Sequence, residues 1–142
     1  QGTILINDAY NANPDSMRAA LRVLTNTEGK RTIAILGDMY ELGDYTEEGH
    51  RLVGEDAAHL GISLLITVGH LAEGIAQGAL GAGMSQDQVV TVFDKKDAVN
   101  YVREYMKPGD VILVKGSRGM KMEEIVKSLQ PAGPDGGENK SA

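Results

Sequence analysis

The sequence contains no cysteine, so the protein can form no disulfide, thiolate metal site or cysteine nucleophile. The lack of cysteine also fits a reducing compartment. No apolar run approaches the roughly 20 residues that a membrane-spanning helix needs, and no signal-peptide pattern is present. The Gly-x-x-x-x-Gly-Lys-Ser/Thr phosphate loop is missing, and no Gly-x-Gly-x-x-Gly follows the first expected strand. These 142 residues therefore cannot hold a nucleoside triphosphate in the P-loop manner by themselves.

Basic residues are outnumbered by acidic ones, and the formal charge of -6 argues against a nucleic-acid partner. An acidic balance still permits a local basic pocket. His50 and His59 lie nine positions apart in one expected helix, which does not match a metal-ligand spacing such as i, i+4. We interpret His70, which follows an expected strand, as a cap or surface residue. The sequence thus predicts no metal site and no contact with a membrane.

Apolar segments of strand length alternate with amphipathic helical segments. Expected strands cover residues 3–9, 32–36, 62–68, 89–93 and 111–114. Expected helices begin near residues 14, 46, 71, 95 and 120, with Asn13 and Thr46 as predicted N-caps of the first two. This order predicts an α/β fold, a Rossmann-like three-layer sandwich whose mostly parallel sheet carries helices on both faces. We expect one domain over residues 1–130 and a disordered tail over 131–142, which is rich in Pro, Gly and polar residues.

Polar residues follow the first expected strand, at Asp8, Tyr10, Asn11 and Asn13. An acid just past a buried strand can accept hydrogen bonds from the two vicinal hydroxyls of a ribose. The alternative is ordinary turn chemistry, because Asn, Asp and Pro are favoured in any strand-to-helix turn. Helix capping explains Asn13 but leaves Asp8 and Tyr10 unexplained.

Two further strand ends carry charged residues. Asp38 and Glu41 lie in a glycine-flanked loop and can meet an amine, although a solvated acidic loop would have the same composition. Lys115, Ser117 and Arg118 lie between a buried strand and a helix, where backbone N–H groups and the arginine fork favour an anion. That anion can be a phosphate or a carboxylate. The alternative is a basic loop in which Ser117 caps the helix.

Taken together, residues 8–17, 36–43 and 114–118 resemble the C-terminal domain of the Mur ligases in the order and spacing of their motifs. The resemblance extends over residues 3–130. Other members carry a Tyr-x-His-x-Pro variant of the first motif, so the version in residues 11–13 indicates the member that adds D-Ala-D-Ala. The resemblance implies a three-domain enzyme: a UDP-substrate domain, a central ATPase domain with the phosphate loop, and this Rossmann-like domain.

In that family, ATP phosphorylates the substrate carboxylate, here that of UDP-N-acetylmuramoyl-tripeptide. The amine of the incoming D-Ala-D-Ala then attacks the acyl phosphate, and an amide, ADP and phosphate result. By position, the resemblance assigns to the nucleotide Asp8, Tyr10, Asn11 and Asn13. It assigns to the dipeptide Ser117 and Arg118, near its carboxylate, and Lys115, which can serve either the substrate or the phosphate. Asp38 and Glu41 are assigned to the amine end of the dipeptide or to the domain interface.

The resemblance further implies a cytoplasmic enzyme of peptidoglycan synthesis that uses ATP and Mg²⁺, both bound mainly by the central domain. It places no catalytic residue in the C-terminal domain, whose partners are the upstream domains of the same chain. The first residue, Gln1 rather than Met, likewise predicts a piece of a longer chain. A different hypothesis is a free-standing α/β module that binds a small anion at residues 115–118.

Overall fold

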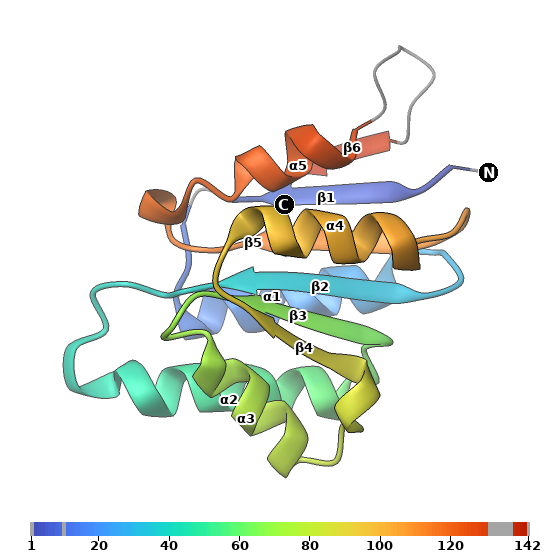
Figure 1. The fold of residues 1–142 in the computed structure, drawn as a ribbon. Helices are drawn as coiled ribbons and strands as arrows, with labels where there is room; N and C mark the ends of the chain where they lie inside the picture. Colours follow the sequence, from blue (N-terminus) through green and yellow to red (C-terminus); the bar gives the residue numbers. More distant parts are fainter. Residues whose placement is uncertain (1, 10, 131–137, 142) are drawn as a thin grey trace.

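The computed structural model describes residues 2–9, 11–130 and 138–141. Strands and helices alternate along the chain, as Figure 1 shows. The strands are β1 (Ile4–Asp8), β2 (Thr32–Gly37), β3 (Leu64–Val68), β4 (Val89–Val92), β5 (Val111–Lys115) and β6 (Glu138–Ser141). The helices are α1 (Pro14–Asn26), α2 (Thr46–His59), α3 (Glu73–Gly81), α4 (Lys95–Tyr105) and α5 (Glu123–Leu129). The five strands expected from the sequence are thereby confirmed.

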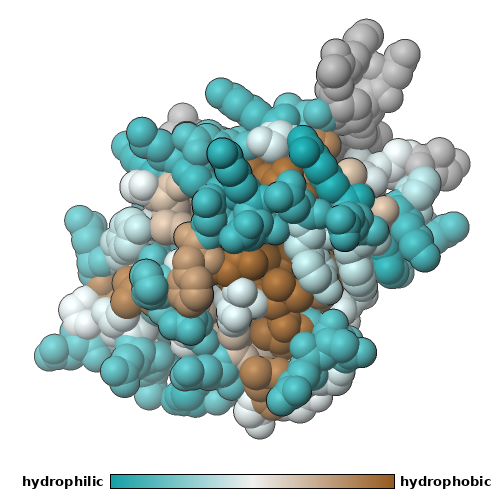
Figure 2. All heavy atoms as spheres, in the orientation of Figure 1, coloured by the Kyte–Doolittle hydropathy of each residue, from teal (hydrophilic) through white to brown (hydrophobic). Residues whose placement is uncertain are grey.

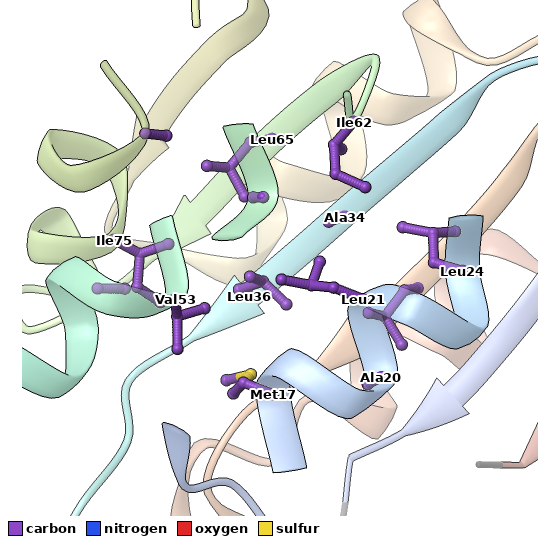
Figure 3. Packing of buried hydrophobic residues seen from close by; sticks show 14 of the residues in the cluster. Met17, Ala20, Leu21, Leu24, Ala34, Leu36, Val53, Ile62, Leu65 and Ile75 are labelled. Carbon is purple, nitrogen blue, oxygen red and sulfur yellow. The ribbon is translucent and has the colours of Figure 1, made fainter. Parts of the chain in front are cut away.

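The strands of the described residues form one parallel sheet in the order β4-β3-β2-β5-β1-β6. Successive side chains along a strand point to opposite faces. In β1, Leu5 therefore packs beneath α4 and α5, whereas Ile6 belongs to the cluster beneath α1, α2 and α3. Figure 3 shows part of that second cluster, where Met17 and Leu21 of α1 lie close to Leu36 of β2. The two helical layers around the sheet confirm the predicted three-layer α/β fold.

The sheet is less completely covered at its β4 edge. The valines of β4 are half-buried, unlike the fully buried residues of β3 and β5. Figure 2 shows apolar atoms at the surface in the middle of the face on which Figure 1 draws α4, β3 and β4. Within the described ranges, no helix combines the length and the apolar character needed to cross a membrane.

The start of α1 follows the sequence prediction closely. Asn13 is its N-cap, and the Asn13 side chain accepts a hydrogen bond from Ser16 N at 2.8 Å. Asn13 N in turn donates to Ser16 Oγ at 3.1 Å, which completes a reciprocal capping box. Pro14 occupies the first helical position, where its missing N–H costs no hydrogen bond. These local contacts fix where the chain turns from β1 into α1.

The start of α2 differs from the prediction that Thr46 caps this helix. A 3-10 helix over Gly43–Tyr45 runs directly into α2, so Thr46 already lies within the helix and Tyr45 is the N-cap. Thr46 Oγ1 donates backward to the carbonyl of Gly43 at 2.7 Å, so it does not cap α2. The prediction was wrong because a preceding turn of 3-10 helix supplies hydrogen bonds that a capping side chain would otherwise make.

Residues 131–142 were expected to form a disordered tail. Residues 138–141 instead form β6, which pairs in parallel with β1, with Glu138 beside Ile4 and Ser141 beside Asn7. Without β6, β1 would be the edge of the sheet and would present unpaired N–H and C=O groups. Those groups explain why a segment without apolar periodicity can add a strand here. Residues 131–137 and 142 lie outside the described residues.

Candidate functional site

Three of the polar loops singled out in the sequence meet at one edge of the sheet. Because β2, β5 and β1 are neighbours in the parallel sheet, their carboxyl ends lie side by side. The described residues of the loops that follow them, 38–42, 116–119 and 11–13, therefore converge. Between them lies a cleft of about 600 Å³, lined by Asn11, Ala12, Asn13, Tyr40, Glu41, Leu42, Ser117, Arg118 and Gly119. This is the place where ligands bind in open α/β sheets.

A larger hollow of about 810 Å³ lies between α2 and α3. Its lining is strongly acidic and includes Glu47, Glu48, Glu55 and Glu73. An exposed acidic groove between two helices is what solvated helix faces produce, and residues of the three motifs do not line it. We therefore place the candidate site in the smaller cleft.

Asp8 and Lys115 form an ion pair at the bottom of this edge. The two residues are direct neighbours in the register of β1 and β5. Lys115 Nζ donates to Asp8 Oδ2 at 2.8 Å and to the carbonyl of Asn11 at 2.7 Å. Only 2% of the Lys115 side chain is exposed, against 15% for Asp8. The Lys115 ammonium thus points toward the loop that follows β1 and is held away from bulk solvent.

Ser117 links the β5 loop to the β2 loop. Ser117 N donates to the carbonyl of Asp38 at 2.9 Å, and Ser117 Oγ accepts from Tyr40 N at 2.7 Å. The Asp38 side chain turns away from the cleft and accepts from Ala72 N, before α3, at 2.8 Å. Asp38 and Ser117 are both buried. Their observed contacts shape the two loops.

Tyr40 forms one wall of the cleft. Its ring packs close to Gly119, and its hydroxyl donates to Met120 Sδ at 3.0 Å. Partial burial, and next the negative charge of Asp38, raise the pKa of the Tyr40 hydroxyl above its ordinary value, while Lys95 opposes the shift. Tyr40 therefore presents a neutral aromatic surface beside the cleft at physiological pH.

Arg118 and Glu41 are exposed and line the same cleft. Glu41 is held at a φ of 65°, in the left-handed region that residues other than glycine rarely adopt. Such backbone strain is concentrated at functional sites. A guanidinium fits a carboxylate through parallel N–H donors, and a carboxylate side chain accepts from an ammonium group. Arg118 and Glu41 can thus accommodate a small molecule that carries both a carboxylate and an ammonium group.

The other predicted site residues lie as follows. Asn11 and Asn13 line the cleft, although the Asn13 side chain is engaged in the α1 capping box. Tyr10 lies outside the described residues. The binding roles of all nine residues remain predictions, and the contacts above divide them into cleft-lining groups and groups that hold the loops in place.

His50 has a positioning role that the sequence did not reveal. It is 1% exposed within α2, and its Nε2 accepts from Met39 N at 3.0 Å. Its Nδ1 must then carry the proton and donate to the carbonyl of Thr46 at 2.6 Å. Gly74 permits the close approach of His50, because a Cβ at position 74 would lie 3.0 Å from His50 Cβ. His50 thereby fixes the start of the loop that carries Glu41.

His70 lies away from the cleft and stacks on the exposed ring of Phe93, with the ring centroids 4.6 Å apart. Among the described residues, no three His, Cys, Asp or Glu side chains gather as they would around a metal ion.

Comparison with protein families identifies the chain. Residues 1–118 match the model of the Mur ligase glutamate ligase domain, which is well over half of the sequence. This chain belongs to the Mur ligase family. Among curated proteins, it is 45% identical over 129 residues to the UDP-N-acetylmuramoyl-tripeptide–D-alanyl-D-alanine ligase of Bacillus subtilis. It is 38% identical over 135 residues to the ligase of the same name from Escherichia coli.

The matched regions cover 90% and 94% of this Mur ligase chain but only 28% of each of the two relatives. Solved structures agree with this assignment. A MurF structure from Acinetobacter baumannii matches 85% of the chain and 26% of its own length, with a TM-score of 0.72 and 32% identity. The MurF ligase from Thermotoga maritima in complex with ADP matches 90% of the chain and 28% of its own, with a TM-score of 0.75. At 24% identity, the latter supports the fold alone.

Proposed function

We propose that this chain is the C-terminal domain of the ligase that joins D-Ala-D-Ala to UDP-N-acetylmuramoyl-tripeptide in peptidoglycan synthesis. The identity of 45% to a ligase of that name over 90% of the chain carries the proposal. The domain comprises residues 1–130, and the complete protein is a cytoplasmic, ATP-dependent, amide-forming ligase. The reacting atoms and Mg²⁺ are held mainly by upstream domains, so the isolated domain is inactive.

The Asp8 side of the cleft serves the nucleotide. Asp8 accepts hydrogen bonds from the ribose hydroxyls, and Asn11 and Asn13 shape the turn around it. Support comes from the position of Asp8 at the carboxyl end of β1, beside the start of α1, which is where nucleotides bind in related α/β sheets. Because the family's phosphate loop is not encoded in these residues, this domain supplies only part of the nucleotide site.

The Arg118 side of the cleft serves the dipeptide. Arg118 binds the carboxylate of D-Ala-D-Ala through its planar fork, and Glu41 lies near the amine. Asp38 and Ser117 act indirectly, since they connect the loops that carry these two residues. Fixing the dipeptide at its carboxylate orients its amine for attack on the acyl phosphate. Catalysis by this domain is then a matter of proximity and orientation.

Substitution of Arg118 in the full-length ligase tests this assignment. Arg118→Ala should raise the KM for D-Ala-D-Ala by about ten- to a hundredfold, because a hydrogen bond to a charged group contributes about 1.5–3 kcal/mol. The KM for ATP should change little. Arg103→Ala, which removes an exposed arginine of α4, is the matched control and should leave both constants unchanged. An unchanged dipeptide KM in Arg118→Ala would refute the carboxylate role.

A further inference from the structure

Lys115 is one of the largest fully buried side chains in the described residues, although it is charged. A buried ammonium group is costly unless acceptors replace its lost water. Both of its observed acceptors lie at the end of β1 or in the loop that follows it. They are Asp8 Oδ2 at 2.8 Å and the carbonyl of Asn11 at 2.7 Å. The ammonium thus reaches from β5 across to the end of β1, toward the proposed nucleotide side.

The two contacts restrain the turn in complementary ways. One fixes a side chain, the carboxylate of Asp8, and the other fixes the backbone three residues further on, at Asn11. Strand pairing alone would fix neither the carboxylate of Asp8 nor the backbone at Asn11, because the register of β1 and β5 ends at the pair formed by Asp8 and Lys115. Lys115 therefore determines how the carboxylate of Asp8 is presented. Among contacts of the described residues, it engages Oδ2 and leaves Oδ1 for a ligand hydroxyl.

We infer that Lys115 is a positioning residue for the nucleotide, which holds Asp8 and the Asn11 carbonyl in the geometry that receives the ribose. This inference rests on the proposed role of Asp8. It replaces the predicted contact of Lys115 with the dipeptide, since the Lys115 ammonium is directed at Asp8 and is buried. Prior orientation of a binding group reduces the ordering that ligand binding would otherwise require.

The test is steady-state kinetics of the full-length ligase carrying Lys115→Met, Asp8→Asn, or both. Lys115→Met should raise the KM for ATP by about ten- to a hundredfold, as small misplacements of a binding group do. The KM for D-Ala-D-Ala should stay unchanged. In the Asp8→Asn background the same substitution should cost much less, because residues that act through one another are not additive. Lys96→Met, on the exposed side of α4, is the control and should have no effect.

A merely structural lysine would lower stability and both substrate affinities together, so the split between the two KM values is decisive. Should Lys115→Met fail to fold, as thermal unfolding would show, Lys115→Gln keeps a donor without the charge and takes its place. A rise in the dipeptide KM alone, or full additivity with Asp8→Asn, would overturn the inference. An unchanged ATP KM in Asp8→Asn would instead refute the proposed nucleotide role of Asp8 itself.

Discussion

A buried charged residue lies at each end of β5, and the two serve different purposes. Asp110, at the amino end, is 1% exposed and accepts from Arg31 Nε at 2.9 Å and Nη2 at 2.7 Å. Asp110 also accepts from Lys107 N at 2.8 Å. Lys115, at the carboxyl end, instead donates a hydrogen bond to Asp8, which lies at the proposed ligand site. Because ligands gather at the carboxyl ends of parallel strands, we expect Asp110 to matter for stability and Lys115 for function.

Asp110→Ala should lower the free energy of unfolding by about 3 kcal/mol, since it removes a buried acceptor from three donors. The measurement is urea unfolding followed by circular dichroism. Asp56→Ala is the matched control: its partners Arg18 and Arg22 are 40% and 51% exposed. A pair with such exposed partners should contribute about 1 kcal/mol or less. Equal losses for the two variants would contradict this distinction.

The environment of Tyr40 should be visible in the alkaline titration of the protein. Burial, followed by the charge of Asp38, raises its pKa above the ordinary value of about 10. The folded protein therefore holds this proton more tightly than the unfolded chain does. The resulting stability is present below pH about 10 and is lost as the pH rises through the folded-state pKa.

Near-ultraviolet absorbance of the wild type and of Tyr40→Phe measures this titration. The difference between the two titration curves should show the ionisation of one tyrosine, with a midpoint above the ordinary tyrosine range. A difference curve with its midpoint at or below pH about 10 would show that burial does not shift Tyr40.

Residue roles were predictable from the sequence only where the partner is close in the chain. The Asn13 cap and its partner Ser16 are three residues apart, so the sequence pattern alone identified it. Lys115 and Asp8 are 107 residues apart, and nothing in either motif signals the pair. For that reason Lys115 and Asp8 were predicted from the sequence as independent ligand contacts. The buried role of His50 was also missed, since its partner Met39 lies in the loop after β2, outside the helix that carries His50.

At the scale of elements, α2 and α3 pack closely against each other. A Cβ at Gly54 would lie 1.9 Å from the carbonyl oxygen of Ile75, and one at Gly78 would lie 2.2 Å from that of Arg51. Backbone lies against backbone here, so no side-chain rotation can relieve a clash. These glycines therefore set the distance between the two helices.

Gly54→Ala should lower the free energy of unfolding by at least about 2 kcal/mol, because the added methyl group forces α2 and α3 apart. Gly81→Ala, at the end of α3, meets no atom within 4 Å and should be neutral or stabilising by up to about 1 kcal/mol. Thermal or urea unfolding of both variants provides the comparison. Tolerance of Gly54→Ala without loss of stability would contradict the packing described here.

The elements themselves were largely predictable, because each strand has a compact apolar run and each helix an apolar stripe. The prediction of a Thr46 cap was wrong because the 3-10 helix at Gly43–Tyr45 has no clear sequence signal. In the same way, the 3-10 helix at Arg118–Met120 delays the last helix, so that α5 begins at Glu123. β6 could not be predicted, since its pairing depends on the unpaired edge of β1 and not on its own residues.

At the scale of the whole molecule, the fold brings residues from the two ends of the chain into one cleft. The order β2-β5-β1 places the first and last motifs side by side although more than a hundred residues separate them. Parallel pairing of β5 with both β2 and β1 is what brings these motifs together. The division of the cleft into a nucleotide side and a dipeptide side remains a proposal, and the chain covers only 28% of the length of the Bacillus subtilis relative.

The most direct test of the proposed function is ligation by the full-length protein that contains this chain. Incubated with ATP, UDP-N-acetylmuramoyl-tripeptide and D-Ala-D-Ala, it should form the amide together with ADP and phosphate, detected by mass spectrometry. Residues 1–142 alone should hydrolyse no ATP under the same conditions. ATP hydrolysis by residues 1–142 alone, or failure of the full-length protein to couple D-Ala-D-Ala, would contradict the account.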